Sequence, residues 1–158
     1  VTPMAEANFW NDPHAADQVL GAHWPLVLAP LDCTMPVVFT PDYMQALARQ
    51  SPAFGGPLAA MAEFYAGFYR SHLGISGCVP HDVMALSWLT VPGAFRLQKG
   101  ALAVLTEGPA IGQTLFQPGG TRSRARCFDG RPDHLVMVDT DPGIFMADYM
   151  TVISGHTR

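Results

Sequence analysis

The feature that most constrains the fold is a short apolar run, WPLVLAPLD, at residues 24–32, which shows no alternation of apolar and polar residues. Two further strand candidates, ALAVLTEG and LVMVDTDPG, cover residues 101–108 and 135–143, and the last of them ends in a turn. Near-continuous apolar runs of this length are typical of parallel strands that are covered on both faces. Helix-like segments separate the runs, so the sequence predicts an α/β layered fold.

Helix-start signals stand between the predicted strands. Asp12-Pro13 and Thr40-Pro41 each combine a capping side chain with a proline in the first helical turn. The Gly-Gly-Pro stretch at residues 55–57 is expected to break the chain before a long helix with an aromatic stripe. In chain order, the predicted helices cover residues 11–22, 39–50, 57–74, 83–91 and 144–153.

Length and composition bound the class of protein. The chain has 158 residues and a mass of 17.0 kDa, which is the size of one domain with a real core. Hydrophobic residues make up 49% and charged residues 14%, which favours strands buried on both faces or a large subunit contact. The net charge of -4 argues against a nucleic-acid-binding surface. No apolar run approaches the roughly 18 residues of a membrane span.

The cysteines and the first residue add two expectations. Cys33, Cys78 and Cys127 show no CxxC spacing and are odd in number, so neither a zinc knuckle nor a disulfide framework is indicated. We therefore expect a reducing, cytoplasmic compartment. Because the chain starts at Val1 rather than at a methionine, we expect it to be part of a longer polypeptide or a processed product.

Glu6 and Asn8 form the first candidate site. They are one residue apart in what we expect to be extended chain, which would place both side chains on one face. A carboxylate beside an amide offers the acceptors and donors that a hydroxyl-rich ligand such as a ribose requires. The alternative is that these residues form a polar strand end that caps the following helix.

His81 and Asp82 form the second candidate site, where a loop shaped by glycine and proline meets the first turn of an apolar helix. A histidine titrates near neutral pH and can act as a general acid. A carboxylate can bind a hard cation such as Ca²⁺ or Mg²⁺. The alternative is that Asp82 only caps the helix while His81 is exposed to solvent.

Tyr65 and Tyr69 lie one turn apart on the long helix and could stack against a planar leaving group and form hydrogen bonds with it. An aromatic stripe at helical spacing is more often part of the core, and we expect Phe64 and Phe68 on the neighbouring face to be buried. The phenolic hydroxyls favour a site role for the two tyrosines.

Taken together, these segments resemble a known family. AEANFWNDPHAADQVL, PLVLAPLDCT, VPHDVMALSWL and LTEGPAIGQT resemble, in this order, four segments of the inosine-uridine preferring nucleoside hydrolases. The resemblance runs over nearly the whole chain but covers only the C-terminal half of the family's domain. It implies that residues 1–158 are the C-terminal portion of a single domain with a Rossmann-like, mostly parallel sheet flanked by helices.

The resemblance also implies a reaction and a role for each matched residue. The reaction is hydrolysis of the N-glycosidic bond of a ribonucleoside in purine or pyrimidine salvage, assisted by Ca²⁺. Asp82 matches a calcium ligand that also reaches a ribose hydroxyl, and His81 matches the histidine that protonates the leaving base. Glu6 and Asn8 match contacts to ribose hydroxyls. Tyr65 and Tyr69 fall where the family places residues that contact the leaving base.

Two positions depart from the family's pattern. Ala7 replaces the aromatic residue usual between the glutamate and the asparagine, which removes a packing surface near the ribose. Val83 replaces the proline that follows His-Asp, which is a mild change.

The closing stretch VDTDPGIFMADYM imitates the start of the family's metal loop, DxDxGxDD, which supplies most calcium ligands and the general base. The two later aspartates of that loop would fall at Phe145 and Met146, and neither side chain can bind calcium. We therefore expect Asp141 to cap the last helix with Pro142 in its first turn. The alternative is a permuted second metal loop at this end of the chain.

The resemblance therefore predicts that the aspartate loop is supplied from outside this chain. The 158 residues alone should be inactive, and they should form a homo-oligomer or associate with a chain that carries the missing half. A rival hypothesis is a non-catalytic module of the same fold for nucleoside binding or assembly. A third is a self-contained metal-dependent phosphohydrolase that uses Asp139 and Asp141.

Overall fold

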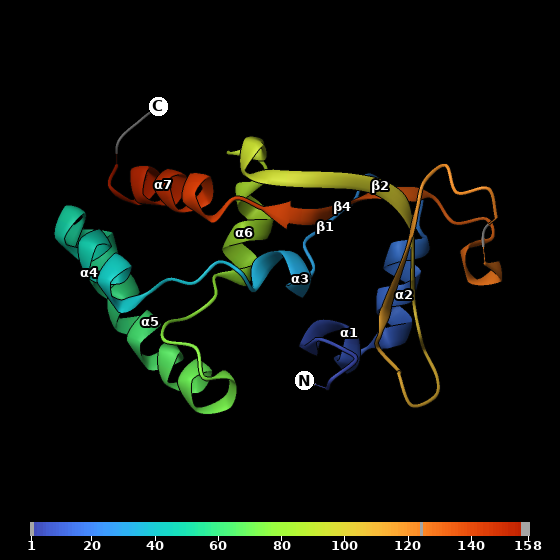
Figure 1. The fold of residues 1–158 in the computed structure, drawn as a ribbon, viewed down its shortest axis with the longest axis horizontal. Helices are drawn as coiled ribbons and strands as arrows, with labels where there is room; N and C mark the ends of the chain where they lie inside the picture. Colours follow the sequence, from blue (N-terminus) through green and yellow to red (C-terminus); the bar gives the residue numbers. More distant parts are fainter. Residues whose placement is uncertain (1, 124, 156–158) are drawn as a thin grey trace. The chain divides into compact units, whose positions relative to one another are not determined.

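The computed structural model describes residues 2–123 and 125–155, which form two compact units (Figure 1). The first unit contains the chain up to Pro30 together with Leu97–Val138, and the second contains Leu31–Arg96 together with the chain from Asp139 onward. Each unit has its own packing and is described separately below.

The first unit holds the sheet and two short helices. Its elements are α1 (Ala7–Asn11), α2 (Pro13–Gly21), β1 (Val27–Leu28), most of β2 (Phe95–Val104), β3 (Thr114–Pro118), the 3-10 turn η2 (Arg126–Phe128) and most of β4 (Asp133–Thr140).

The second unit is mainly helical. Its elements are α3 (Leu31–Thr34), α4 (Pro41–Gln50), α5 (Pro52–Leu73), α6 (His81–Ser87), the 3-10 turn η1 (Pro92–Ala94) and α7 (Pro142–Ile153).

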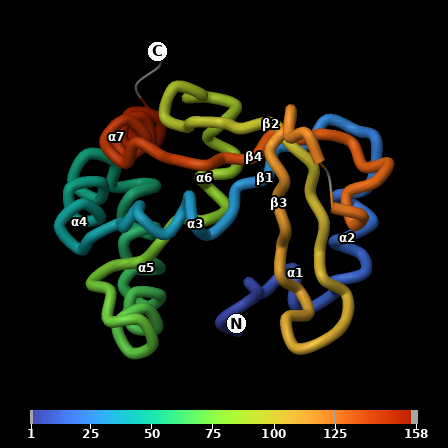
Figure 2. Tube along the Cα trace, turned by 45° about the vertical axis from the view of Figure 1, so that its right-hand side comes forward, coloured from blue at the N-terminus to red at the C-terminus, as the bar shows by residue number. Residues whose placement is uncertain are grey.

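The sheet has the strand order β1-β4-β2-β3. β1 pairs with β4 in parallel, with Val27 opposite Leu135, and β2 pairs with β3 as an antiparallel hairpin (Figure 2). The predicted α/β fold is confirmed. The first predicted strand is shorter than expected, because Leu31–Thr34 turns into the helix α3 directly after it.

The second half of strand β2, residues 101–104, is apolar without alternation because it is covered on both faces. Leu102 and Val104 pack with Leu20 of α2 on one face, whereas Ala103 packs with Phe128 on the other. Because successive side chains of a strand point to opposite faces, both faces of β2 need apolar residues here.

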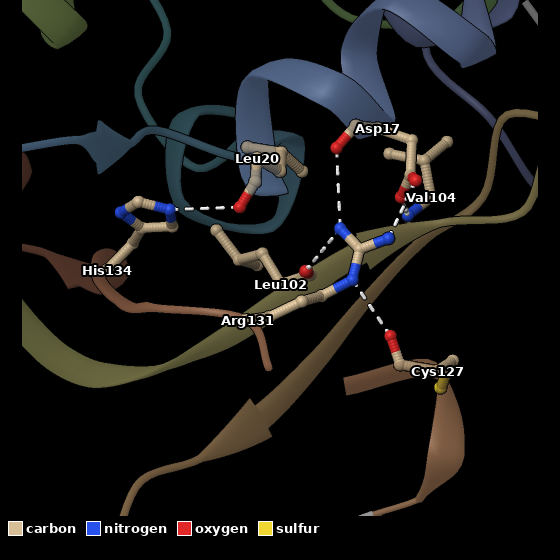
Figure 3. A network of polar contacts seen from close by, with 7 residues as sticks. All are labelled: Asp17, Leu20, Leu102, Val104, Cys127, Arg131 and His134. Atoms are coloured by element: carbon tan, nitrogen blue, oxygen red, sulfur yellow. Dashed lines mark hydrogen bonds and ion pairs between the residues drawn. The ribbon is translucent and has the colours of Figure 1, made fainter. Parts of the chain in front are cut away.

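A clamp around Arg131 ties α2 to the sheet in the first unit (Figure 3). The guanidinium pairs with the Asp17 carboxylate at 2.6 Å and donates to the carbonyls of Leu102 (3.2 Å) and Cys127 (2.8 Å). Asp17 also accepts a hydrogen bond from the backbone N–H of Val104 at 2.8 Å. The charge of each partner is therefore matched, and the pair connects the helix, the strand β2 and η2.

Helices α4 and α5 lie side by side in the second unit (Figure 1). The expected break at residues 55–57 is wrong, because α5 starts at Pro52 and continues through Pro57. Gly55 is needed for packing, since a Cβ atom there would collide with the carbonyl oxygen of Leu47 on α4. The glycine thus allows two helix backbones to approach closely, and the local helix tolerates the proline near its first turns.

The helix caps agree with the sequence. Asp12 accepts from the N–H of Ala15, Thr40 from that of Tyr43 and Asp141 from that of Ile144. Helix α6 ends at Ser87, a few residues earlier than expected, and Pro92 begins the turn η1. Within residues 2–123 and 125–155, no helix is both long enough and apolar enough to cross a membrane.

Candidate functional site

The imidazole of His81 is held between two hydroxyl groups in the second unit. Its Nε2 lies 2.9 Å from the hydroxyl of Tyr69 on α5, and its Nδ1 lies 2.7 Å from the hydroxyl of Thr34 at the end of α3. Tyr69 is 3% exposed and Thr34 is 1% exposed, while His81 is half-buried. The alternative of a solvent-exposed histidine is therefore wrong.

The loop before α6 delivers His81 to this position. Gly77 has a φ of 137°, which disfavours any other residue, and a Cβ there would collide with the backbone of Phe39. Phe39 and Cys78 form a short antiparallel bridge next to this glycine. Pro80 then precedes the first residue of α6, which is His81. The Gly/Pro loop thus fixes the start of the helix that carries the histidine.

Tyr69 and Tyr65 are in contact through their rings, with centroids 5.0 Å apart in an edge-to-face arrangement. Burial, and to a lesser degree the neighbouring Tyr65, raises the pKa of Tyr69 above its ordinary value, and the backbone N–H of Val79 partly opposes this. Tyr69 therefore stays protonated and can act as a hydrogen-bond donor. Tyr65 is 45% exposed, so the pair of tyrosines extends from the half-buried histidine to the surface.

The neighbouring phenylalanines do not follow the expectation. Phe64 is 89% exposed and Phe68 is 50% exposed, although both were expected in the core. The spacing of the aromatic residues predicts a stripe along α5, but it does not determine which face of α5 is covered by α4. In the structure, α4 packs against the face that carries Gly55.

Asp82 is exposed on the first turn of α6 and does not cap it. The capping position belongs to Pro80, and no side chain caps this helix. The carboxylate is thus directed to solvent from the same turn as His81. Within the described residues no group of three or more His, Cys, Asp and Glu side chains could hold a metal. Calcium takes six to eight oxygen ligands, so these residues do not form a complete calcium site.

Glu6 and Asn8 belong to the first unit, and their local structure differs from the expectation. Asn8 lies within helix α1 and is exposed, and Glu6 is the capping residue of that helix. The Oε1 atom of Glu6 accepts from the N–H of Phe9 at 2.7 Å. The chain is therefore helical rather than extended here, because a carboxylate three residues before a free N–H favours a helix start. Their contact with a ribose stays a prediction.

The closing aspartates have local structural partners. Asp141 caps α7, as expected, with Pro142 in the first turn. Asp139 lies 3.6 Å from Arg96 in an exposed ion pair. Sequence reasoning gave no role to Thr34, whose only signal was its place at the end of PLVLAPLDCT, one of the segments that resemble the family.

Comparison with known proteins places these observations in a family. The model of the inosine-uridine preferring nucleoside hydrolases matches residues 1–147. A non-specific ribonucleoside hydrolase, RihC, of Salmonella schwarzengrund (strain CVM19633) is 38% identical over 107 residues, covering 68% of this chain and 33% of the relative. A probable uridine nucleosidase 1 of Oryza sativa subsp. japonica is 31% identical over 119 residues, covering 75% of this chain and 37% of the relative.

A solved structure is similar over almost the whole chain. The plant nucleoside hydrolase PpNRh1 superposes with a TM-score of 0.88 at 26% identity, covering 97% of this chain and 48% of that one. The chain therefore spans about half the length of the solved relative that it matches.

Proposed function

Because the chain belongs to the inosine-uridine preferring nucleoside hydrolase family, we propose that it forms the leaving-base side of an enzyme that hydrolyses ribonucleosides to ribose and free base. The observation that carries the proposal is the pair formed by His81 and Tyr69. It combines a group that can transfer a proton with a protonated phenol, and it continues into the exposed ring of Tyr65.

The chemistry of the leaving group explains why these residues suit the reaction. A purine or pyrimidine that leaves without a proton departs as an anion, so a positioned acid lowers the barrier. His81 is the general acid, and Tyr69 bridges it toward the base by a hydrogen bond. Tyr65 offers an aromatic ring on which the planar base stacks.

Fewer observations support the residues that we propose contact the ribose and the calcium ion. Glu6 and Asn8 contact ribose hydroxyls, and the cap on α1 uses only the Oε1 atom of Glu6. Asp82 is one ligand of a calcium ion, which when bound would hold the ribose diol and a water molecule. Since the described residues do not complete such a site, the remaining ligands and the general base come from an aspartate loop outside these 158 residues.

The rest of the protein follows from the same proposal. Residues 1–158 are the C-terminal portion of one nucleoside hydrolase domain, which functions as a homo-oligomer or with a chain that carries the other half. The protein takes part in nucleoside salvage in the cytoplasm, where the free thiols of Cys33 and Cys78 would stay reduced. The named relatives differ in base preference, so inosine and uridine are both required as test substrates.

The test is an assay of ribose release from inosine and uridine with and without a calcium chelator. The whole protein, or this chain co-expressed with a polypeptide that bears the aspartate loop, should be active and sensitive to the chelator. The 158 residues purified alone should be inactive. Chelator-sensitive turnover by that chain alone would contradict the proposal and would favour Asp139 and Asp141 as the metal ligands.

Calcium titration by calorimetry tests the metal ligand directly. Asp82→Ala should weaken calcium binding, whereas the matched variant Asp139→Ala should leave it unchanged. The opposite pattern would refute the assignment of Asp82.

A non-catalytic nucleoside-binding or assembly module is the second candidate function. The lack of a group of three metal-ligating side chains among the described residues favours it. It predicts that nucleosides bind without turnover even when the aspartate loop is present, which calorimetry and the ribose assay distinguish together.

A further inference from the structure

Thr34 is a buried polar residue of the second unit whose role the function above leaves open. Its hydroxyl lies 2.7 Å from Nδ1 of His81 and 3.5 Å from the carbonyl oxygen of Leu31. The side chain is 1% exposed, so burying the hydroxyl is costly unless it is hydrogen-bonded. The imidazole is its close partner.

The two hydroxyls constrain the imidazole from opposite edges. A neutral imidazole carries a proton on one nitrogen and a lone pair on the other, so one hydroxyl must donate to it and the other must accept. The hydroxyl of Thr34 lies 2.7 Å from Nδ1 but 3.5 Å from the carbonyl oxygen of Leu31, so its proton is best placed for donation to Nδ1. Nε2 then carries the ring proton and donates it to the phenol oxygen of Tyr69.

The surroundings of Tyr69 favour the same direction. Burial and a side-chain hydrogen bond with Tyr65 both raise the pKa of Tyr69, and a hydrogen bond raises a pKa when it uses the proton of the group. The phenol proton is thus directed to Tyr65, and the phenol oxygen accepts from Nε2. Hydrogen bonds then run in one direction, from Thr34 to Nδ1 of His81 and from Nε2 of His81 to Tyr69.

We propose that Thr34 is a positioning residue that holds His81 in the tautomer protonated on Nε2, with this N–H directed to Tyr69. Its kinetic consequence rests on the proposed function, but its structural content does not. Without the hydroxyl of Thr34, the imidazole can take either tautomer and can rotate by half a turn, which moves the acidic edge away from the leaving base. The Nδ1 atom of His81 would also lose its hydrogen bond with the buried hydroxyl of Thr34.

Nitrogen-15 NMR of histidine-labelled protein tests the tautomer without any need for activity. The spectrum is recorded at about pH 8.5, well above the ordinary histidine pKa of about 6.5. His81→Ala identifies the signals of His81 among the six histidines. We expect a pyrrole-type Nε2 and a pyridine-type Nδ1. The reverse assignment would overturn the proposal.

Two substitutions at the same position form a matched set. Thr34→Val keeps the shape but removes the hydroxyl, and it should shift both ring nitrogens toward averaged values. Thr34→Ser keeps the hydroxyl and should preserve the native spectrum. If Thr34→Val unfolds the protein, as seen by circular dichroism, Thr34→Ala takes its place. Unchanged ring shifts in a folded variant without the hydroxyl would refute the proposal.

Kinetics show whether Thr34 acts through His81. In the active protein, Thr34→Val should lower kcat by about 10- to 100-fold with little change in KM, as for other residues that orient a functional side chain. Thr34→Ser should recover most of the loss. In the His81→Ala background, Thr34→Val should cause no further loss, and an equal loss in both backgrounds would contradict a role through His81. If the unsubstituted protein shows no turnover, the proposed function fails while the NMR result still decides the role of Thr34.

Discussion

The two polar networks of this protein are both largely buried, yet they are built from different kinds of groups. In the first unit, Arg131 and Asp17 are opposite charges with 19% and 24% exposed side chains, and backbone carbonyls take up further guanidinium N–H groups. In the second unit, His81 lies between the neutral hydroxyls of Thr34 and Tyr69. Each network joins elements that are far apart in the sequence.

The difference teaches what distinguishes a structural network from one suited to chemistry. Arginine is not deprotonated in proteins, so the proton positions around Arg131 are fixed and the network can only hold elements together. Imidazole and hydroxyl groups can each donate or accept, so a proton can move along the second network. That network also leads to the half-exposed Tyr65, where a ligand can reach it.

The largest expected effect tests the chemical network. In the active enzyme, His81→Ala should lower kcat on inosine or uridine by about 100- to 10,000-fold, which is the usual contribution of general acid catalysis. A nitrophenyl riboside has a good leaving group and should be spared. Equal losses on both kinds of substrate would show that His81 does not protonate the base, and the comparison between the two networks would fail.

The next effect tests the structural network. Arg131→Met keeps the packing of the side chain but leaves the Asp17 carboxylate without its partner, so the free energy of unfolding should fall by about 2–4 kcal/mol. The exposed pair of Arg96 and Asp139 is the control, and Arg96→Met should cost less than about 1 kcal/mol. Urea denaturation measures both. A loss of kcat per folded molecule in Arg131→Met would show that the network around Arg131 also affects catalysis and is not purely structural.

The sequence predicted those parts of the molecule that depend on neighbouring residues. The caps at Asp12, Thr40 and Asp141 were correct because each joins a side chain to an N–H three residues later. At Glu6 the cap was anticipated only in the alternative interpretation, because the alternation of polar residues suggested an extended chain with both side chains on one face.

The remaining features depend on contacts between distant residues. Thr34 and His81 are 47 positions apart in the sequence, so no local pattern pointed to their hydrogen bond. The exposure of Phe64 depends on which face of α5 meets α4, and the helix periodicity of α5 does not determine this. His81, Tyr65 and Tyr69 were identified by residue type and by the family resemblance, and the structure adds the contacts among them.

A packing prediction concerns the helix pair that carries Tyr69. Gly55→Ala places a methyl group against the backbone of Leu47 and should destabilise the protein by about 1–3 kcal/mol. The adjacent Gly56 has open space around its Cβ position, so Gly56→Ala should stabilise it by about 0.4–1 kcal/mol. Thermal denaturation compares the two variants. Similar effects of both would mean that the glycines act only through helix propensity and that α4 does not position α5 through this contact.

The smallest effect concerns Tyr43, a half-buried phenol whose hydroxyl has one fixed acceptor, as the groups of the structural network do. Its hydroxyl donates to the carbonyl oxygen of Met146 at 2.7 Å, so Tyr43→Phe should cost about 1 kcal/mol near neutral pH.

Burial, and to a lesser degree Tyr149, raises the pKa of Tyr43 above its ordinary value. The unfolded chain therefore ionises first, and the parent protein loses stability as the pH rises above about 10, by up to about 1.4 kcal/mol per pH unit for this group. The phenylalanine variant lacks this loss, so the difference in unfolding free energy should close by about pH 11. Urea denaturation at both pH values measures it, and a constant difference would mean that the folded phenol ionises as readily as the unfolded one.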